Sequence, residues 1–215
     1  MIISPGRRLI FAHAPKTGGT AVALALEARA MKDDILIGDT PKAVRRRNRL
    51  KGAKAAGRLW KHSTLRDVEG LVSREEMAEM FVFTLTRNPW DRLVSYYHWL
   101  QDQRFDHPAV GVAKSMSFSD FLNHPAILPS FTSAPIAAMT TDGAGVDHAD
   151  LVIRLEHWAE DAAPLFAHLG FDLMLERVNA SKRDRDYRRY YSDADAALVV
   201  QACAQDIAQG GYRFD

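Results

Sequence analysis

Three apolar runs rich in β-branched and aromatic residues recur along the chain, and a stretch with helical character follows each of them. They are RLIFAHA at 8–14, FVFTLT at 81–86 and DLVIRLE at 150–156. Such runs predict buried strands, whereas an Ala- and Leu-rich segment such as AVALALEARAM, within 19–31, predicts a helix. Strands that alternate with helices indicate a parallel sheet covered on both faces. We therefore expect an α/β fold, a three-layer sandwich with a central parallel sheet flanked by helices.

Capping residues predict where several helices begin. Ser73 is followed three residues later by Glu76, and Ser192 by Asp195, as in a capping box. Asn88 is a good N-cap residue before Pro89. A helix should thus begin directly after the strand at 81–86.

Further segments complete the predicted order of elements. DILIG at 34–38 indicates a short second strand, FSDFLNH at 118–124 a short helix, and the Pro- and Gly-containing stretch 125–147 a loop-rich region. In the helix that follows the third run, Pro164 must start a new helix or kink the old one, and Gly170 ends it.

Composition favours one ordinary globular domain over residues 1–215. The chain is 47% hydrophobic and 26% charged, without repeats or a long linker. It contains no 18-residue apolar run and no signal-peptide pattern, so we expect no transmembrane segment and a cytoplasmic location. The single Cys203 excludes disulfides within the chain. Eight histidines without ligand spacing give no support for a metal site.

The sequence HAPKTGGTAV, residues 13–22, lies at the predicted turn from the first strand to its helix. Gly18 and Gly19 permit close backbone approach, and the first helical turn presents unpaired N–H groups at the positive end of the helix dipole. Lys16 adds a cation, and Thr17 and Thr20 add hydroxyl groups. The loop is therefore a candidate phosphate cradle. An ordinary turn with a solvated lysine is the alternative.

Two common nucleotide motifs do not match. In a Walker A loop the lysine follows the glycines, but Lys16 precedes them. No apolar strand ends in a metal-binding aspartate, since the run at 150–156 ends with Arg154 and Glu156. A G-x-G-x-x-G fingerprint is also missing.

A second cationic turn follows the strand at 81–86. Arg87 stands at the carboxyl end of that strand, and Ser95 lies on the same helical face as Asp91, one turn further on. An arginine with a hydroxyl group can form a phosphate site. Alternatively, Arg87 pairs with Asp91 or Glu156 and Ser95 is a packing residue. If both turns bind anions, one ligand with two separate anionic groups explains them, since ligands in such folds lie beyond the carboxyl ends of strands.

Positive charge is concentrated in one segment. Residues 42–61 contain nine basic and no acidic residues, so the remainder of a chain with net charge +1 carries −8. The segment is a solvated, loosely packed stretch or a surface for an anionic acceptor. Contact with nucleic acid is disfavoured by the acidic remainder.

The two turns resemble a known family. PKTGGT at 15–20 looks like the 5'-phosphosulfate loop, and RNPWDRLVS at 87–95 like the 3'-phosphate loop, of sulfotransferases that use 3'-phosphoadenosine 5'-phosphosulfate (PAPS). The chain resembles most the carbohydrate branch, which includes the heparan and chondroitin 2-O-sulfotransferases and bacterial relatives. KHSTLRDV at 61–68 resembles the segment with the catalytic histidine, and 179–214 the usual C-terminal ending. The fold that the resemblance implies is P-loop-like.

The resemblance implies in-line transfer of a sulfuryl group from PAPS to an acceptor hydroxyl, leaving 3'-phosphoadenosine 5'-phosphate (PAP). Lys16 would stabilise the leaving group, and Thr17, Gly18, Gly19 and Thr20 would hold the 5'-phosphate and sulfuryl oxygens. A sulfuryl group carries less negative charge than a terminal phosphoryl group, so no metal is expected.

His62 matches the family's catalytic base. His13, which we interpret as a brace for the loop, and Glu156 are the rivals for that role. Arg87 and Ser95 would bind the 3'-phosphate, and Ser181, Lys182 and Arg183 would close over the nucleotide. The acceptor implied is a carbohydrate or other hydroxyl compound and not a nucleic acid. An anionic acceptor would be bound by residues 42–61. Among the aromatic residues only Trp60 is expected to face the acceptor, since Tyr96, Tyr97 and Trp99 have the spacing of core residues.

Two other functions stay open at this point. A kinase-like phosphoryl transferase would require magnesium and a nucleoside triphosphate. A non-catalytic nucleotide- or polyanion-binding protein would keep the cradle without turnover.

Overall fold

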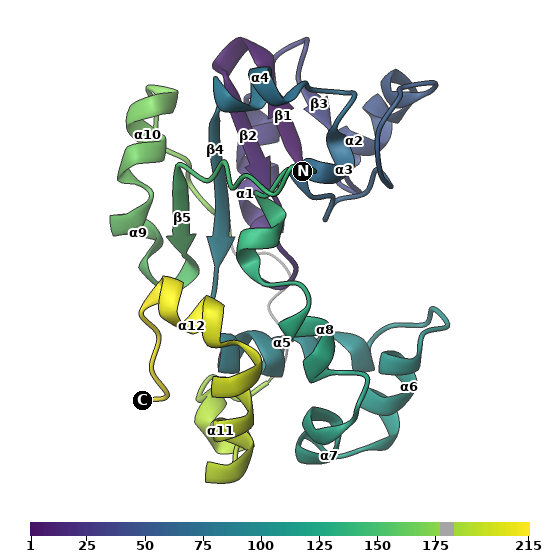
Figure 1. The fold of residues 1–215 in the computed structure, drawn as a ribbon, viewed down its shortest axis with the longest axis vertical. Coiled ribbons are helices and arrows are strands. Elements are labelled where there is room, and N and C mark those ends of the chain that lie inside the picture. The colour runs from purple at the N-terminus through teal and green to yellow at the C-terminus, as the bar shows by residue number, and fades with distance from the viewer. Residues whose placement is uncertain (177–182) are drawn as a thin grey trace. The chain divides into compact units, whose positions relative to one another are not determined.

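The computed structural model describes residues 1–176 and 183–215 and divides into two compact units (Figure 1). The first unit comprises Met1–Thr86 and Ile136–Val178, and the second Arg87–Pro135 and Asn179–Asp215. Each unit has its own hydrophobic core, and the two are described separately below.

The first unit is built on a five-stranded sheet with the strand order β3-β1-β2-β4-β5. Strand β2 pairs in parallel with β4, so that Ala12 lies opposite Thr84, and β4 pairs in parallel with β5. Strand β1 is antiparallel to both β2 and β3. The strands are β1 (Ile2–Ser4), β2 (Leu9–Ala12), β3 (Ile35–Leu36), β4 (Phe81–Thr86) and β5 (Leu151–Arg154).

Alternating side chains of these strands form two cores, one on each face of the sheet. Phe11 and Phe83 pack on one face with residues of α1, α2, α9 and α10. Ile10 and Val82 pack on the other face with residues of α3, α4 and the 3-10 turn Ile136–Met139. The helices are α1 (Gly19–Ala28), α2 (Pro41–Arg46), α3 (Leu65–Val68), α4 (Arg74–Ala78), α9 (Trp158–Asp161) and α10 (Ala163–Leu169). Helix, sheet and helix thus form three layers within this unit.

The second unit is helical. Aromatic and aliphatic side chains of α5 form its core with those of the other helices, and the indole of Trp90 donates a hydrogen bond to the carbonyl oxygen of Ala196 at 3.1 Å. The helices are α5 (Pro89–Gln101), α6 (Pro108–Ser115), α7 (Phe118–Asn123), α8 (Leu128–Thr132), α11 (Asp193–Ala202) and α12 (Ala204–Gly210), with a 3-10 turn at Tyr187–Tyr190.

The predicted α/β class with helices around parallel strand pairs is confirmed. The sheet is mixed rather than entirely parallel, because β1, which was not among the predicted strands, pairs antiparallel with β2 and β3. The capping residues act as expected. The side chain of Asn88 accepts from the backbone N–H groups of Trp90 and Asp91, and capping boxes start α4 at Ser73 and α11 at Ser192.

Candidate active site

The loop after β2 has a strained backbone. Lys16 adopts a positive φ of 64°, which is rare for a residue with a Cβ, and Gly18 has φ 82° just before α1. The first N–H groups of a helix have no acceptor within the helix, so the start of α1 presents backbone donors at the end of this loop. Lys16 lies in the loop just before them. The geometry suits an anion, as the sequence predicts.

Internal contacts fix the shape of this loop. The hydroxyl of Thr17, which is fully buried, donates to the carbonyl oxygen of Ala14 at 2.9 Å and so braces the turn. A Cβ on Gly18 would lie 2.7 Å from a methyl group of Leu155, and a Cβ on Gly19 only 2.2 Å from the ring of His13. Both glycines are therefore required by close packing, and the His13 ring lies directly against the loop.

His62 lies beside the loop, held by the backbone of His13. Its Nδ1 is 2.7 Å from the carbonyl oxygen of His13, and the two imidazole centroids are 4.8 Å apart. A carbonyl oxygen can only accept, so Nδ1 carries the proton and Nε2 keeps its lone pair in the neutral ring. This is the tautomer that a general base needs.

Burial keeps both histidines neutral. Desolvation lowers the pKa of His62 to about 4, with a smaller raising effect from the hydrogen bond to His13 and a lowering effect from Lys61. Desolvation also holds the pKa of His13 well below its usual range. Lys61 itself pairs with Asp39 at 2.7 Å.

In the second unit, two arginines converge on one carboxylate. Arg87 binds Asp91 through Nε at 2.9 Å and Nη2 at 2.6 Å, and Arg183 binds the other oxygen of Asp91. Ser95, one helical turn on from Asp91, is buried. The structure thus brings Arg87 and Arg183 together around Asp91, the pairing that was the alternative interpretation of Arg87. Ser181 and Lys182 lie outside the described residues.

Comparison with known proteins decides the family. A model described as the sulfotransferase family matches residues 1–207. The chain belongs to the sulfotransferase family. The predicted enzyme class is therefore confirmed.

The fold of this sulfotransferase is also found in a solved relative. The crystal structure of mouse sulfotransferase SULT7A1 complexed with PAP matches with a TM-score of 0.53 and 15% sequence identity, over 94% of this chain and 84% of that chain. No curated protein sequence matches.

The remaining predicted site residues of the sulfotransferase lie in different surroundings. Glu156 is exposed, in a 3-10 turn after β5. Trp60 is 42% exposed and lies edge-on to His62, at 5.0 Å between ring centroids. Tyr97 is buried and donates to the carbonyl oxygen of Met116, whereas Tyr96 and Trp99 pack on the core of the second unit. These three aromatic residues are core residues, as their spacing indicates.

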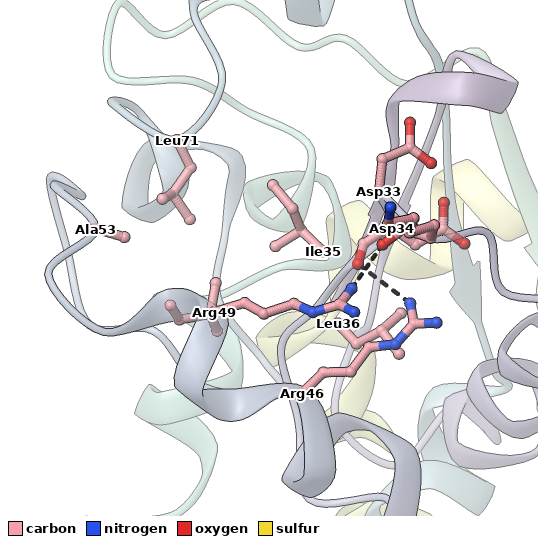
Figure 2. Close-up of a pocket in the computed structure, with 10 residues that line it drawn as sticks. Asp33, Asp34, Ile35, Leu36, Arg46, Arg49, Ala53 and Leu71 are labelled. Atoms are coloured by element: carbon pink, nitrogen blue, oxygen red, sulfur yellow. Dashed lines mark hydrogen bonds between the residues drawn. The ribbon is translucent and has the colours of Figure 1, made fainter.

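The basic segment of the sulfotransferase is only partly available to a ligand. Arg46 and Arg49 donate to the carbonyl oxygens of Met31 and Lys32 at 2.7 and 2.6 Å, beside a pocket of about 410 Å³ at strand β3 (Figure 2). Other basic residues of the segment are exposed and make no ion pair within the described chain: Arg45, Arg47, Lys51, Lys54 and Arg58. The segment thus combines structural arginines with a charged surface.

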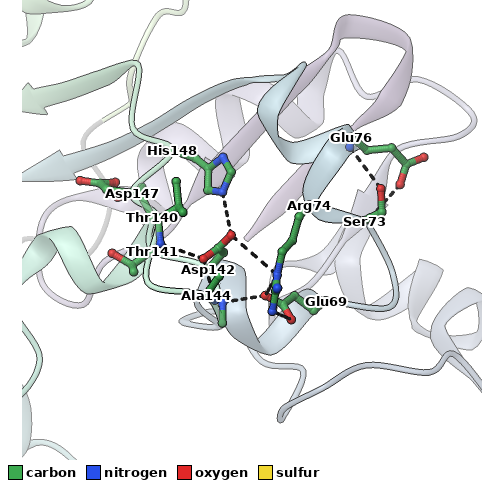
Figure 3. A network of polar contacts seen from close by, with 12 residues as sticks. Glu69, Ser73, Arg74, Glu76, Thr140, Thr141, Asp142, Ala144, Asp147 and His148 are labelled. Atoms are coloured by element: carbon green, nitrogen blue, oxygen red, sulfur yellow. Dashed lines mark hydrogen bonds and ion pairs between the residues drawn. The ribbon is translucent and has the colours of Figure 1, made fainter.

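A polar network in the first unit of the sulfotransferase was not anticipated from the sequence. Asp142, buried, accepts from the backbone N–H groups of Ala144 and Val146 and from the ring of His148, and Arg74 bridges it to Glu69 (Figure 3). These hydrogen bonds, with His148 first, lower the pKa of Asp142 to about 2. The Asp-x-Ala-x-Val pattern of a tight turn was the only local signal, and Arg74 and Glu69 come from a distant segment.

Two searches over the described residues of the sulfotransferase were negative. No group of three or more His, Cys, Asp or Glu side chains could hold a metal ion. No helix among them has the length and apolar character to cross a bilayer.

Proposed function

We propose that this sulfotransferase moves the sulfuryl group of PAPS to a hydroxyl group of a carbohydrate in the cytoplasm, leaving PAP, without a metal ion. Residues 1–215 act as one sulfotransferase domain, which the family match from residue 1 to 207 supports. We assign it to the carbohydrate branch and to the bacterial type on the resemblance of its sequence motifs. The observation that best supports the chemistry is the histidine with a fixed tautomer, His62, beside the anion-binding loop.

The loop residues Lys16, Thr17, Gly18, Gly19 and Thr20 hold the 5'-phosphosulfate end of the donor. Backbone N–H groups at the start of α1 bind the oxygens, and the ammonium group of Lys16 neutralises charge on the bridging oxygen as its bond to sulfur breaks. The hydroxyl of Thr17 donates to Ala14, so Thr17 contributes through its backbone and by holding the loop in shape.

Arg87, Ser95 and Arg183 bind the 3'-phosphate, together with Ser181 and Lys182. Two guanidinium groups around one carboxylate provide the forked donors that a phosphate requires, and Asp91 holds them in place. In the chain, Arg87 directly follows β4, and the anion-binding loop follows the neighbouring parallel strand β2. The mouse sulfotransferase of similar fold was solved in complex with PAP, which supports this assignment of the donor.

The acceptor reacts by displacement at sulfur. Nε2 of His62 takes the proton of the attacking hydroxyl as the new O–S bond forms, and the bond between sulfur and the bridging oxygen of PAPS breaks, which releases PAP. The exposed basic residues of 42–61 favour an anionic carbohydrate over nucleic acid, given the acidic remainder of the chain.

Calorimetric titration with PAP tests the nucleotide assignment. Wild-type protein should bind PAP, and Arg87→Ala should weaken binding at least tenfold because it removes a charge-assisted contact. Arg104→Ala, an exposed arginine of the same unit, is the matched control and should bind like wild type. Wild-type protein that binds no PAP would contradict the proposal.

Assays with added chelator separate sulfuryl from phosphoryl transfer. Transfer of label from [³⁵S]PAPS should continue in EDTA, whereas a kinase-like enzyme would require magnesium and a nucleoside triphosphate. His62→Gln should keep PAP affinity and lose turnover. If wild type and His62→Gln bind PAP equally and the wild type sulfates no glycan, the protein is a binding protein instead.

A further inference from the structure

Trp60 is an exposed aromatic residue next to the proposed base. Its side chain is 42% exposed, although indole rings are usually covered in a folded protein. Its ring meets that of His62 edge-on, with 5.0 Å between the centroids and 88° between the planes. The exposed indole therefore lies next to the proposed base, where the acceptor hydroxyl has to bind for its proton to be removed.

A buried serine fixes the turn that carries Trp60. The hydroxyl oxygen of Ser63 accepts from the backbone N–H of Trp60 at 2.9 Å and lies 2.9 Å from the carbonyl oxygens of both Arg58 and Trp60. Ser63 is fully buried, and its own N–H donates to the Trp60 carbonyl at 3.0 Å. The turn 58–63 is therefore closed by its own hydrogen bonds and does not depend on a ligand for its shape.

Both ends of the turn are anchored to the first unit. Before it, Gly57 donates to the carbonyl oxygen of Asp67 at 2.9 Å, and a Cβ at this glycine would lie only 2.1 Å from an Asp67 carboxylate oxygen. Within it, His62 is fixed to His13. An exposed aromatic ring on a backbone held this firmly is pre-organised for binding.

A cation completes the surface. The guanidinium carbon of Arg58 lies 5.4 Å from the centre of the Trp60 ring, and the Arg58 side chain is exposed. An indole face binds the apolar C–H face of a sugar ring, and a guanidinium binds a carboxylate or sulfate with paired hydrogen bonds. The guanidinium lies over the indole ring, and together the two groups match a pyranose that carries an anionic substituent.

We propose that the turn 58–63 is the subsite that positions the acceptor sugar, with Trp60 as its stacking platform and Arg58 as the partner of its anionic substituent. This inference rests on the proposed function, because it assigns a substrate to the site of His62. Trp60 and Arg58 select and orient the acceptor, and His62 takes its proton.

Steady-state transfer of label from [³⁵S]PAPS tests the subsite. The acceptors are three acidic polymers, hyaluronan, polygalacturonate and alginate, and the same polymers with their carboxyl groups reduced to alcohols. Trp60→Ala should raise the acceptor KM about tenfold with kcat changed less than about twofold, and Trp60→Phe should restore most of the loss. Phe105→Ala, another exposed aromatic residue, is the control and should behave like wild type.

Arg58→Met isolates the charge, since it keeps the apolar stem. It should raise the KM for the acidic polymer about tenfold and leave the KM for the reduced polymer unchanged. An equal effect on both polymers overturns the role of Arg58.

The platform itself can also fail. An unchanged acceptor KM in Trp60→Ala overturns it, and so does a loss of kcat alone, which would make Trp60 a positioning residue for His62. Wild-type enzyme that binds PAP but modifies none of the acidic polymers overturns the anionic-sugar assignment, whereas loss of PAP binding itself removes the proposed function and this inference with it.

Discussion

Nδ1 of His62 donates a hydrogen bond to the carbonyl oxygen of His13 over 2.7 Å. His13 also packs its ring against Gly19, so one residue supports the proposed anion-binding loop with its side chain and the proposed base with its backbone. The loop and the base are thereby coupled within the first unit, and changes in one should reach the other.

The pH dependence of catalysis should reflect this burial. Because desolvation lowers the pKa of His62 to about 4, the free enzyme keeps an unprotonated base through the neutral range. We expect the acid limb of kcat/KM to fall near pH 4 rather than near 6.5, as measured with a fixed acceptor between pH 3.5 and 8. A limb near 6.5 would contradict the buried environment described for His62.

Folding stability should fall on mild acidification. The unfolded chain protonates histidine near pH 6.5, while native His62 resists protonation down to about pH 4, so the unfolded state binds more protons in this window. The pKa of His13 is also lowered, so His13 adds to this loss of stability at acidic pH. Urea denaturation should show lower stability at pH 5 than at pH 7. His62→Gln should reduce this dependence, and an equal slope in that variant would contradict the assignment.

Gly19→Ala should damage the site. Its Cβ would meet the ring of His13 at 2.2 Å, so the ring or the loop that it packs against must move. We expect turnover to drop at least tenfold, and PAP affinity to fall as well. Gly111→Ala is the matched control, since its Cβ meets nothing within 4 Å on helix α6. It should keep activity and raise stability by about 0.5–1 kcal/mol in thermal denaturation.

Removing one partner of a buried ion pair in the second unit should lower the unfolding free energy strongly, whereas replacing both partners with apolar residues should change it little. Arg92 and Asp206 lie 3.1 Å apart with side chains 6% and 3% exposed. Arg92→Met leaves Asp206 buried without this partner and should cost about 3–5 kcal/mol of unfolding free energy. The double variant with Asp206→Leu should recover most of it. If the single change costs less than about 1 kcal/mol by urea denaturation, the pair is not the structural contact described here.

Local signals in the sequence predicted much of the fold. The N-cap at Asn88, the capping boxes at Ser73 and Ser192 and the helix restart at Pro164 are short-range hydrogen-bond or steric effects, and all are present in the structure. Strand β1 has only three residues and ends before Pro5, so its own pattern was too short to identify. It is stabilised by pairing with β2 and β3, which the sequence does not encode locally.

In the candidate site, too, the sequence predicts local features but not contacts between distant residues. The loop at 15–20 and the pair Arg87 and Asp91, four residues apart on a helix, follow from sequence spacing. The second contact of Asp91, with Arg183, joins residues 92 positions apart, and the support of His62 by His13 joins residues 49 apart. No periodicity or local motif indicates such contacts, because they depend on how distant segments pack.

Strand β3 is an edge strand of the sheet, and two arginines lie beside it. That strand is two residues long, and guanidinium groups of Arg46 and Arg49 occupy carbonyl oxygens of the segment that leads into it. An incoming extended chain would meet these positive charges next to a strand of only two residues, which disfavours edge-to-edge pairing. Basic residues that distinguish this segment in the sequence thus place positive charge at the edge of the sheet, a feature that opposes pairing with a second chain.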